Sequence, residues 1–407
     1  MQASNINLRH LRAFCAVVAQ GSVSMAARQV FLSQPAITQA IAKLEQVYDL
    51  RLFERSRAGM HPNDAALRLA ERAQRAFAML GAGIQEAQRA GGERAPRTSR
   101  DLPLSLTATQ LRAFVAVGTA ENFSLAARES GASQSALHRS TRELEELLGI
   151  DLFERTTRGI ALTRAGQALF QQAKLAFAEL VQARMELDDS KGVQSGTITI
   201  GSMPLSRHFI IPGAIIAFAA EYPAVNVKVI EAPYNELLHG LRYGEVDAVI
   251  GALRNPVPVE DVAQEKLFRA SLKVIARRDH PLAKRQKLSM RDLGGYAWVV
   301  PPMGTPTRER FDAMFKRAGL PLPEGLVESL SVQLIRAMLT DSDRLTLISS
   351  HQLHAEIETG LFRALPCDLG NTQRDIGLTL RRGWKPTATQ RALLAALRAA
   401  AKHYSEI

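Results

Sequence analysis

The 407-residue sequence contains only two cysteines, Cys15 and Cys367. Two cysteines provide neither a disulfide framework nor a cluster of metal ligands, and both lie in apolar stretches. We therefore expect a reduced chain that holds no metal and no cofactor.

Long hydrophobic runs are also missing. The longest, near residues 209–220, is interrupted by Pro212 and Gly213 and is too short to cross a bilayer. The N-terminal stretch MQASNINLRHLRAF lacks a basic start followed by an apolar core, so it does not have the form of a secretory signal. These features predict a soluble, cytoplasmic protein with no membrane partner.

Motifs for catalysis are missing as well. The sequence has no G-x-S-x-G, no H-E-x-x-H and no phosphate-binding glycine-rich loop, and its nine histidines are scattered. We predict that the protein is not an enzyme.

Positive charge, by contrast, is in excess. The chain has 51 Lys and Arg against 40 Asp and Glu, a net charge of +11, and its hydrophobic content of 46% is that of a globular protein. Its length suits two to four domains. The charge favours an anionic partner, and nucleic acid is the usual candidate.

The N-terminal half contains a duplication. Residues 11–70 align with residues 111–170 without a gap, and roughly 22 of the 60 positions are identical, which is well above chance. The shared segments include LRAF, S-x-A-A-R, S-Q-x-A and L-F-E-R. A period this long that occurs only twice indicates a duplicated domain.

Each copy is predicted to form three short helices. In the first copy, the first helix should end near Gly21, and Ser24 can cap the second. Ser33 can cap the third, with Pro35 in its first turn, where the missing N–H is harmless. The spacing then turns Ile37, Ile41 and Leu44 inward.

The third helix is left with a polar outer face. Amide, hydroxyl and basic side chains on such a face can read base edges in the DNA major groove. The alternative is an ordinary three-helix packing module with a solvated polar face. In the first copy the outer residues are Gln34, Thr38, Gln39 and Lys43.

The run AARQVFLSQPAITQAIAKLEQVYDLRLFER resembles the winged helix-turn-helix domain of LysR-type transcriptional regulators. The second copy resembles the same domain, although Ser135 replaces the helix-start proline and Thr141 the usual isoleucine. The resemblance implies that operator DNA is the partner. The residues expected to contact it are Ser33, Gln34, Pro35, Thr38, Gln39, Lys43 and Arg55 in the first copy and Ser133, Gln134, Ser135, His138, Arg139, Arg142, Arg155 and Arg158 in the second.

The two copies differ in charge and in the wing. Residues 8–60 carry seven Lys/Arg and three Asp/Glu, net +4, whereas residues 108–160 carry six and seven, net −1. Phosphate attraction therefore favours the first copy. Its wing, however, departs from the family at Pro62, Asn63 and Ala66. We call the third helix of each copy its reading helix, because it would enter the major groove. We expect the first copy to have the better reading helix and the second copy to have the better wing.

A long helix is predicted after each wing. In the second copy small and apolar residues recur at spacings of four and three, a heptad seam suited to helix pairing or to plain core packing. The same seam in the first copy should weaken at Gly81 and Gly83. The resemblance implies dimerisation through this helix, and we hypothesise that the two helices pair within one chain. The seam consists of Leu169, Ala173, Ala176, Leu180, Ala183 and Leu187.

From Gly196 onward, strands alternate with helices, which predicts βαβ units and a parallel sheet. The segments IGSMPLSRHFIIPGAIIAFAAEYPAVNVKVIEA and LRYGEVDAVIGAL resemble the effector-binding domain of the same family. The resemblance implies a periplasmic-binding-protein-like α/β fold of two lobes around a cleft. Strands are predicted at 197–200, 225–230, 247–250, 272–276, 298–300, 326–329, 345–348 and 376–380.

The expected order is therefore multidomain: two winged helix-turn-helix domains with linker helices, then a two-lobe α/β domain. The predicted boundaries are 1–68 for the first DNA-binding domain, 69–101 for its linker helix and flexible linker, 102–164 for the second, 165–190 for the dimerisation helix and 195–407 for the effector domain. Within the effector domain, lobe 1 takes about 195–268 and 371–407, and lobe 2 about 269–370.

Ligands in such sheets bind beyond the carboxyl ends of strands, near helix N-termini. Two segments meet this description, one after strand 197–200 and one after strand 298–300, and the second would suit a carboxylate or another anion. The alternative is that Ser202 and Thr307 are plain helix caps. The candidate effector contacts are Ser202, Met203, Pro204, Thr305, Thr307 and Arg308.

Together these features predict a LysR-type regulator that binds operator DNA and a small-molecule effector. The resemblance implies a homodimer or homotetramer that contacts RNA polymerase. The alternatives are a solute-binding protein or a small-acid enzyme of related two-lobe fold, with the N-terminal copies serving as interaction modules.

Overall fold

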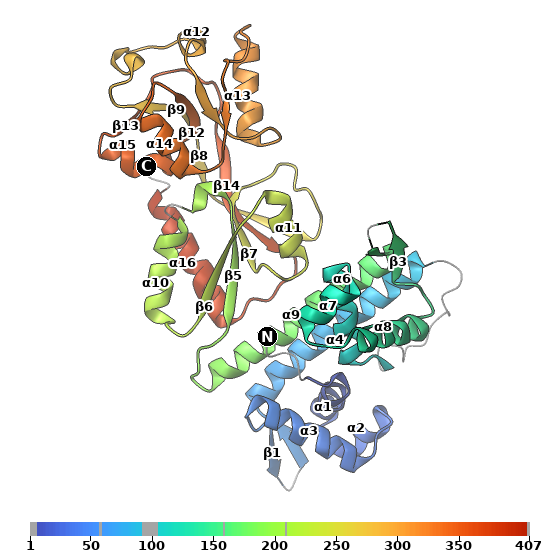
Figure 1. The fold of residues 1–407 in the computed structure, drawn as a ribbon. Coiled ribbons are helices and arrows are strands. Elements are labelled where there is room, and N and C mark those ends of the chain that lie inside the picture. The colour runs from blue at the N-terminus through green and yellow to red at the C-terminus, as the bar shows by residue number, and fades with distance from the viewer. Residues whose placement is uncertain (1–5, 57–58, 92–104, 158, 208–209, 405–407) are drawn as a thin grey trace. The chain divides into compact units, whose positions relative to one another are not determined.

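The computed structural model describes residues 6–56, 59–91, 105–157, 159–207 and 210–404 (Figure 1). The chain divides into two compact units. The first comprises residues 1–196 with the short segments 242–245 and 386–388, and the second comprises most of the remainder.

The first copy begins with three short helices whose ends follow local rules. Gly21 adopts the left-handed conformation (φ 62°) that ends the first helix, as predicted. The cap of the second helix is Ser22 and not Ser24, because Ser22 has the extended backbone of an N-cap and its Oγ accepts from the Met25 N–H. Ser33 caps the third helix as predicted. The elements are α1 (Leu8–Gln20), α2 (Val23–Gln29), α3 (Gln34–Tyr48), β1 (Phe53–Ser56), β2 (Gly59–Pro62) and α4 (Asp64–Ala90).

The second copy repeats this order element by element. Asn122 takes the capping place of Ser22, and Ser133 that of Ser33. The predicted boundaries fall close to the helix starts, although both long helices begin slightly earlier, at Asp64 and Arg164. The elements are α6 (Ala108–Ala120), α7 (Phe123–Ser130), α8 (Gln134–Leu148), β3 (Phe153–Thr156), β4 (Gly159–Leu162) and α9 (Arg164–Ser190).

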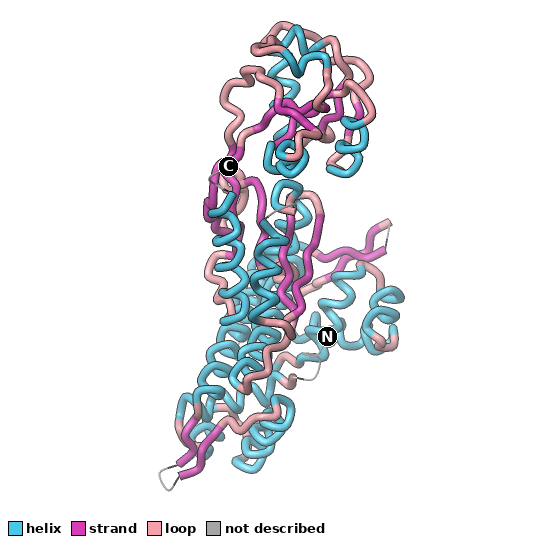
Figure 2. Tube along the Cα trace, turned by 90° about the vertical axis from the view of Figure 1, so that its left-hand side faces the viewer, coloured by secondary structure: helices cyan, strands magenta, loops and turns pink. Residues whose placement is uncertain are grey.

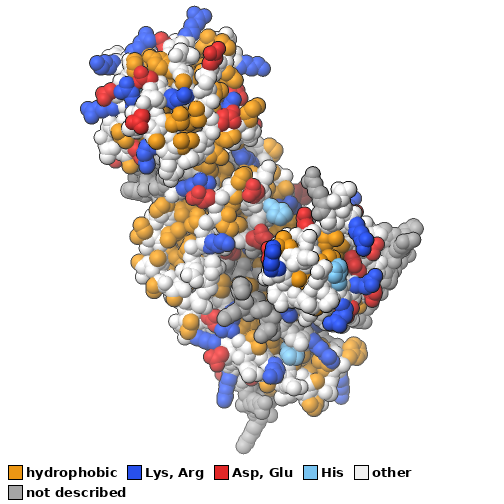
Figure 3. Space-filling view, in the orientation of Figure 1, with side chains coloured by type: hydrophobic (Ala, Val, Ile, Leu, Met, Phe, Trp, Pro, Cys, Tyr) orange, Lys and Arg blue, Asp and Glu red, His pale blue; other side chains and the backbone are white. Residues whose placement is uncertain are grey.

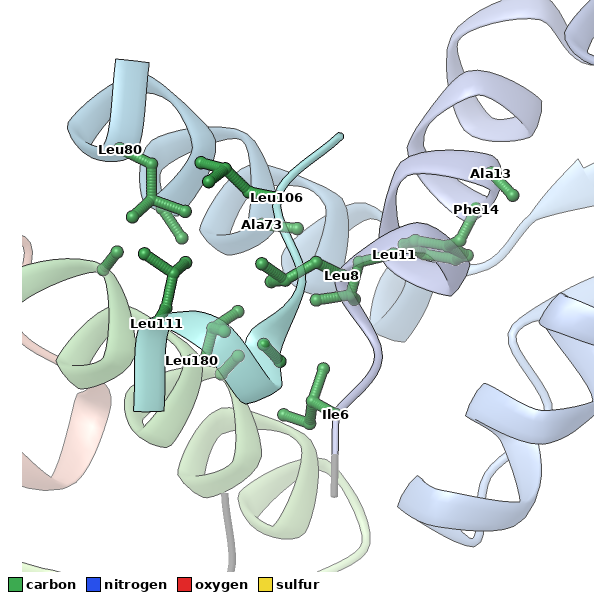
Figure 4. Close-up of a cluster of buried hydrophobic side chains, with 14 of the residues drawn as sticks. Ile6, Leu8, Leu11, Ala13, Phe14, Ala73, Leu80, Leu106, Leu111 and Leu180 are labelled. Carbon is green, nitrogen blue, oxygen red and sulfur yellow. The ribbon is translucent and has the colours of Figure 1, made fainter. Parts of the chain in front are cut away.

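The helices α4 and α9 pair along their length within one chain (Figures 1 and 2). Arg72, early in α4, contacts Glu186, late in α9, and Gly83, late in α4, lies against Leu169, early in α9, so the pair is antiparallel. Figure 4 shows Ala73 and Leu80 of α4 and Leu180 of α9 in one apolar cluster with Leu11 and Leu111. All six predicted seam residues are buried in this cluster: Leu169, Ala173, Ala176, Leu180, Ala183 and Leu187.

This pairing agrees with the hypothesis of an intrachain helix pair and changes the meaning of the dimerisation residues. The six seam side chains are covered by α4 of the same chain, which leaves association with a second chain to be proposed for other surfaces.

The expected weakness of the α4 seam at Gly83 is wrong. A Cβ built at Gly83 would lie 2.7 Å from Cβ of Gln172, so glycine permits the close approach of the two helices. Gly81 has nothing within 4 Å and does not take part in the contact.

A buried charge cluster crosses the seam. Arg72, only 4% exposed, donates from Nη1 to Glu179 Oε2 at 2.8 Å and from Nη2 to Glu186 Oε1 at 2.5 Å. Nη1 also donates to Gln182 Oε1 at 2.9 Å. On the same side, Arg75 donates from Nη2 to Glu179 Oε1 at 3.0 Å. Two guanidinium groups of α4 thus face two carboxylates of α9, and the apolar seam acquires one defined register.

The end of α9 holds the first copy in place. Arg184 Nη1 donates to the carbonyl oxygen of Val47 at 2.8 Å, and Lys191 Nζ to that of Tyr48 at 2.5 Å. These carbonyls lie in the last turn of α3, where a cation also offsets the negative end of the helix dipole. The second linker helix therefore supports the first reading helix.

The second unit contains two five-stranded sheets, ordered β6-β5-β7-β14-β8 and β11-β10-β12-β9-β13. The helices are α10 (Ile210–Glu221), α11 (Tyr234–Arg242), α12 (Met290–Gly294), α13 (Pro306–Arg317), α14 (Val332–Thr340), α15 (His354–Glu358) and α16 (Ala388–Tyr404). The strands are β5 (Thr197–Ser202), β6 (Asn226–Glu231), β7 (Ala248–Ala252), β8 (Val262–Ala270), β9 (Leu272–Arg277), β10 (Trp298–Val300), β11 (Val327–Glu328), β12 (Leu345–Ser349), β13 (Phe362–Ala364) and β14 (Arg374–Arg381).

The parallel pairing predicted from the alternation of strands and helices is found between β5 and both β6 and β7, and between β10 and both β11 and β12. Each sheet also has antiparallel pairs, which were not predicted. β14 pairs antiparallel with β7 and with β8, and β9 pairs antiparallel with β12 and β13. The sequence prediction missed β8 and β13, which are edge strands. The chain passes from the first sheet to the second between β8 and β9, at Ser271, and returns before β14, close to the predicted crossings.

The charge cluster gives a stability prediction. Replacing Arg72 with Met leaves the buried Glu179 and the half-buried Glu186 with less positive charge, so we expect the free energy of unfolding to fall by about 3 kcal/mol. Chemical denaturation followed by circular dichroism measures this. Arg68→Met is the control, because Arg68 is exposed one turn earlier on α4 and its loss should change stability by less than about 0.5 kcal/mol. Equal effects of the two substitutions would contradict a role for the cluster.

Candidate nucleic-acid interface and ligand cavity

The helix α3 separates an apolar inner face from a polar outer face. Ile37, Ile41 and Leu44 are buried, as predicted. Thr38 donates to the carbonyl oxygen of Gln34 at 3.1 Å, and Lys43 Nζ donates to Gln46 Oε1 at 3.2 Å, both at the surface. The predicted contact residues are all exposed: Ser33, Gln34, Pro35, Thr38, Gln39 and Lys43.

The charge of Lys43 acts on the neighbouring helix α1. The pKa of His10 in α1 is lowered, first by burial and then by the charges of Arg9 and Lys43. The influence of Lys43 on α1 arises because α1 packs on α3. The periodic pattern of α1 gave no sign of it.

The helix α8 has the same two-faced form with different chemistry. His138 stacks on Phe123 with a ring separation of 3.6 Å, and Ser124 Oγ donates to Gln134 Oε1 at 3.3 Å. Two of the predicted contact residues are thus partly engaged within their own domain, whereas Arg139 and Arg142 are exposed. The exposed set is Ser133, Gln134, Ser135, His138, Arg139 and Arg142.

Thr141, which replaces the usual isoleucine, is accommodated in the core. It is buried, and its hydroxyl donates to the carbonyl oxygen of Leu137 at 2.9 Å. The substitution therefore leaves no unsatisfied hydroxyl against the apolar face.

The two wings are antiparallel hairpins of the same register. Phe53 pairs with Pro62 in the first copy, and Phe153 with Leu162 in the second. Arg155 is exposed on its hairpin. The side chain of Arg55 and the whole of Arg158 lie outside the described residues. Figure 3 shows other Lys and Arg side chains along the outer edges of both copies.

The expectation that the second copy has the better wing is not supported by the backbone. Thr163 caps α9 by accepting from the Gly166 N–H at 2.9 Å, and its hydroxyl donates to the Asp151 carbonyl at 2.8 Å. Asn63 makes both equivalent bonds in the first copy, to the Ala66 N–H at 2.9 Å and to the Arg51 carbonyl at 2.7 Å. An amide carries a donor and an acceptor, so it replaces the hydroxyl completely.

A carboxylate fixes the start of each wing. Glu45 Oε1 accepts from the Leu52 N–H at 2.8 Å, and Glu145 Oε1 accepts from the Leu152 N–H at the same distance. Glu145 also accepts from the Phe153 N–H, and its pKa is nevertheless raised because burial outweighs these bonds. These glutamates tie each reading helix to its wing.

The second unit contains a cavity of about 740 Å³. It is lined by residues that follow β5, β6, β7, β10 and β11, where ligands of α/β sheets usually bind. The volume suits a small molecule. Three arginines line it, Arg207, Arg254 and Arg374, against one acidic residue, Glu231.

The structure divides the predicted effector contacts. Met203, Pro204, Thr305 and Thr307 line the cavity, whereas Ser202 and Arg308 do not. The Ser202 side chain is fully buried beside Ser206, and the Arg308 guanidinium is held by Asp312 and Glu328. Thr305 is the N-cap of α13, so the plain structural alternative holds for Thr305 and not for Thr307.

Arg374 is the polar residue of the cavity that sequence reasoning missed. Its Nη1 donates to Thr307 Oγ1 at 2.9 Å, while its Nε is buried without a hydrogen-bond partner among the described residues. Its pKa is lowered to about 10, first by burial and then by the charges of Arg310 and Arg254. The hydroxyl oxygen of Thr346, also in the lining, is likewise buried and unpaired. The only signal in the sequence was an arginine directly before a predicted apolar strand.

The geometry defines a class: two helix-turn-helix domains with exposed polar third helices, joined to an α/β unit with a ligand-sized cavity, form a ligand-responsive DNA-binding regulator. Comparison with protein families agrees. The model for the bacterial regulatory helix-turn-helix protein of the lysR family matches twice, at residues 8–67 and 108–167, and that for the LysR substrate binding domain matches residues 191–402. The chain belongs to the LysR family of transcriptional regulators.

Individual relatives are similar over most or all of the chain. The HTH-type transcriptional regulator GalR of Pseudomonas putida is 37% identical over 393 residues, 96% of both chains. PcaQ of Agrobacterium fabrum is 28% identical and covers 72% of this chain with 94% of its own length, so it is a shorter protein. A full-length OxyR variant from Pseudomonas aeruginosa, 21% identical, covers 72% of this chain and 97% of its own with a TM-score of 0.52, which shows the fold alone.

The described residues contain neither a membrane-spanning helix nor a group of metal ligands. No helix there has the length and apolar character needed to span a membrane. In the same part of the chain, no three His, Cys, Asp or Glu side chains are grouped so that they could hold a metal ion.

The duplicated cap gives a prediction with a built-in control. Asn63→Ala removes the cap of α4 and one tie to the wing, so we expect the free energy of unfolding to fall by about 1 kcal/mol. Asn63→Thr introduces the residue that the second copy has at this place and should retain most of the stability. Thermal unfolding of both variants measures the difference, and a loss of equal size in both would show that the two caps are not interchangeable.

Proposed function

We propose that this LysR-family chain binds double-stranded operator DNA through α3 and α8 and that a small anionic molecule in the cavity alters this binding. The DNA-binding part of this proposal rests on the exposed polar face of both third helices. Each third helix is followed by a wing hairpin, and the two hairpins have the same register. A helix of this kind fits the major groove, and a wing beside it can reach the phosphates.

The two reading helices supply different contacts. Gln34 and Gln39 offer amides that suit adenine, and Lys43 is exposed on the same helix. The helix α8 offers Arg139 and Arg142, which suit guanine or phosphate. Both copies therefore have the chemistry for DNA, and their base preferences should differ.

The ligand is proposed to be an anion, such as a small carboxylate. A guanidinium with a buried, unpaired Nε is costly, and a carboxylate satisfies it with a charge-assisted hydrogen bond. The excess of arginine over acid in the lining supports the same sign of charge. In this proposal the second unit works as a periplasmic-binding-protein-like pair of lobes, and the ligand acts through its preference for one arrangement.

The remaining parts of the proposal follow from these two sites. The chain acts by binding and not by catalysis, in keeping with relatives that are named transcriptional regulators. Association into a homodimer or homotetramer and contact with RNA polymerase are proposed for surfaces other than the buried seam of α9.

Paired substitutions test the reading helices. Gln34→Ala/Lys43→Ala and Arg139→Ala/Arg142→Ala should each weaken binding to the operator, by about 1–3 kcal/mol for each base contact that is lost. Footprinting and electrophoretic mobility shifts measure this. The basic substitutions should also reduce the salt dependence of binding, because each phosphate contact releases counterions.

Lys228→Ala is the matched control for the loss of charge, because Lys228 is exposed on β6 of the second unit. It should leave the footprint unchanged. If one pair of substitutions on a reading helix behaves like this control, that helix does not read DNA.

Thermal unfolding in the presence of small molecules tests the cavity. Small aromatic and aliphatic carboxylates are expected to raise the melting temperature of the full chain, by an amount that grows with concentration, whereas the matching amides should not. Arg374→Met should abolish the shift, because it removes the unpaired guanidinium. Arg363→Met is the control, since Arg363 is exposed on β13 and does not line the cavity. A shift that survives in Arg374→Met would place the anion elsewhere.

A further inference from the structure

The charge cluster on the seam breaks the symmetry between α4 and α9. Position 72 of α4 corresponds to position 172 of α9, and these are Arg and Gln. The carboxylates that accept hydrogen bonds from Arg72 are those of Glu179 and Glu186 in α9. The corresponding residues of α4 are Met79 and Glu86. The guanidinium is thus found on one helix and the pair of acceptors on the other.

Pairing of like helices would lose this match. In an antiparallel pair of two α9 helices, Gln172 of each would face Glu179 and Glu186 of the other, so the buried Glu179 and the half-buried Glu186 would have no arginine from position 72. In a pair of two α4 helices, Arg72 would meet Met79 and keep only Glu86. Since an uncompensated buried charge costs several kcal/mol, the cluster favours the unlike pair strongly.

The reading helices that this pair carries are also unlike. Six exposed positions differ between α3 and α8, and four of them change charge. The differences are Pro35/Ser135, Thr38/His138, Gln39/Arg139, Ala42/Arg142, Lys43/Glu143 and Gln46/Glu146. A face with one lysine is paired with a face that has two arginines and two glutamates.

We propose that the cluster of Arg72, Arg75, Glu179 and Glu186 restricts linker pairing to α4 with α9, which pair within one chain in this structure, so that a single chain reads a DNA site made of two unlike half-sites. This inference rests on the proposed binding of DNA by both reading helices. An ordinary two-fold dimer presents the same helix twice and matches a palindrome. This chain presents two different helices from one polypeptide and matches a site without two-fold symmetry.

Selection from a pool of random-sequence DNA duplexes tests the proposal with the full chain. Repeated recovery of bound DNA and sequencing should yield a consensus of two half-sites that differ in sequence. A palindromic consensus, or one with a single half-site, would overturn the inference and leave DNA binding intact. If no sequence is enriched, the proposed DNA-binding function fails together with the inference.

Transplanted reading faces sharpen this result. The variant Thr38→His/Gln39→Arg/Ala42→Arg/Lys43→Glu gives α3 the outer face of α8 at exposed positions, where the fold tolerates change. It should select a more symmetrical consensus in which both half-sites match the second half-site of the unaltered chain. The reciprocal variant His138→Thr/Arg139→Gln/Arg142→Ala/Glu143→Lys should duplicate the first half-site. An unchanged consensus in both variants would contradict the proposal.

A disulfide trap tests the pairing itself, independently of DNA. Gly83→Cys/Gln172→Cys, with Cys15 and Cys367 replaced by Ser, places two thiols where a small shift of the helices allows a disulfide. On a non-reducing denaturing gel the oxidised chain should run at the mass of one chain. Adding Arg72→Gln, which gives α4 the residue of α9, should lower the yield of the intrachain disulfide severalfold, because neither cysteine faces another in a pair of like helices, whereas the exposed control Arg68→Gln should not. Dimers as the main product without Arg72→Gln, or no response to it, would sink the proposed role of the cluster.

Discussion

The antiparallel contact between α4 and α9 is the constraint on which the rest of the first unit depends. Six apolar positions of each helix close the seam, and the first reading helix is then held by hydrogen bonds from Arg184 and Lys191 at the end of α9. A helix-turn-helix domain of this size has little core of its own. Its position is therefore set by the linker helix of the other copy, and the two copies form one compact unit.

The seam alone does not decide which helices meet, because its small and apolar side chains occur in both copies. The choice of partner helix is set by Arg72, because this buried guanidinium is stabilised only where Glu179 and Glu186 can accept its hydrogen bonds. Replacing such a cluster with apolar residues often raises stability, so its value lies in excluding other pairings. Duplication made this possible, because two linked copies can diverge until one has the cation and the other the anions, which identical chains cannot do.

Local rules predicted much of the fold and little of the cavity. The cap at Ser33, the turn at Gly21 and the buried seam of α9 follow from short-range patterns, and the structure has them where expected. The substitution of Asn63 for threonine did not predict that the cap is kept, because the amide carries the same donor and acceptor as the hydroxyl. The strand β8 was missed because an edge strand alternates polar and apolar residues without a continuous hydrophobic run. Arg374 has no local signature beyond its place shortly before a predicted strand, since its partner Thr307 is 67 residues away in sequence.

The position of Arg374 also indicates how a bound ligand could change the arrangement of the two sheets. It begins β14, the strand that joins β7 to β8 in one sheet, and its guanidinium bonds to Thr307 in the first turn of α13, which belongs with the other sheet. The same side chain therefore touches both halves of the second unit and has an N–H left unpaired in the cavity. An anion that bonds to this group must share the guanidinium with Thr307. Any preference of the ligand for one spacing of the two sheets is then transmitted through a single residue, and no chain of intermediate contacts is needed.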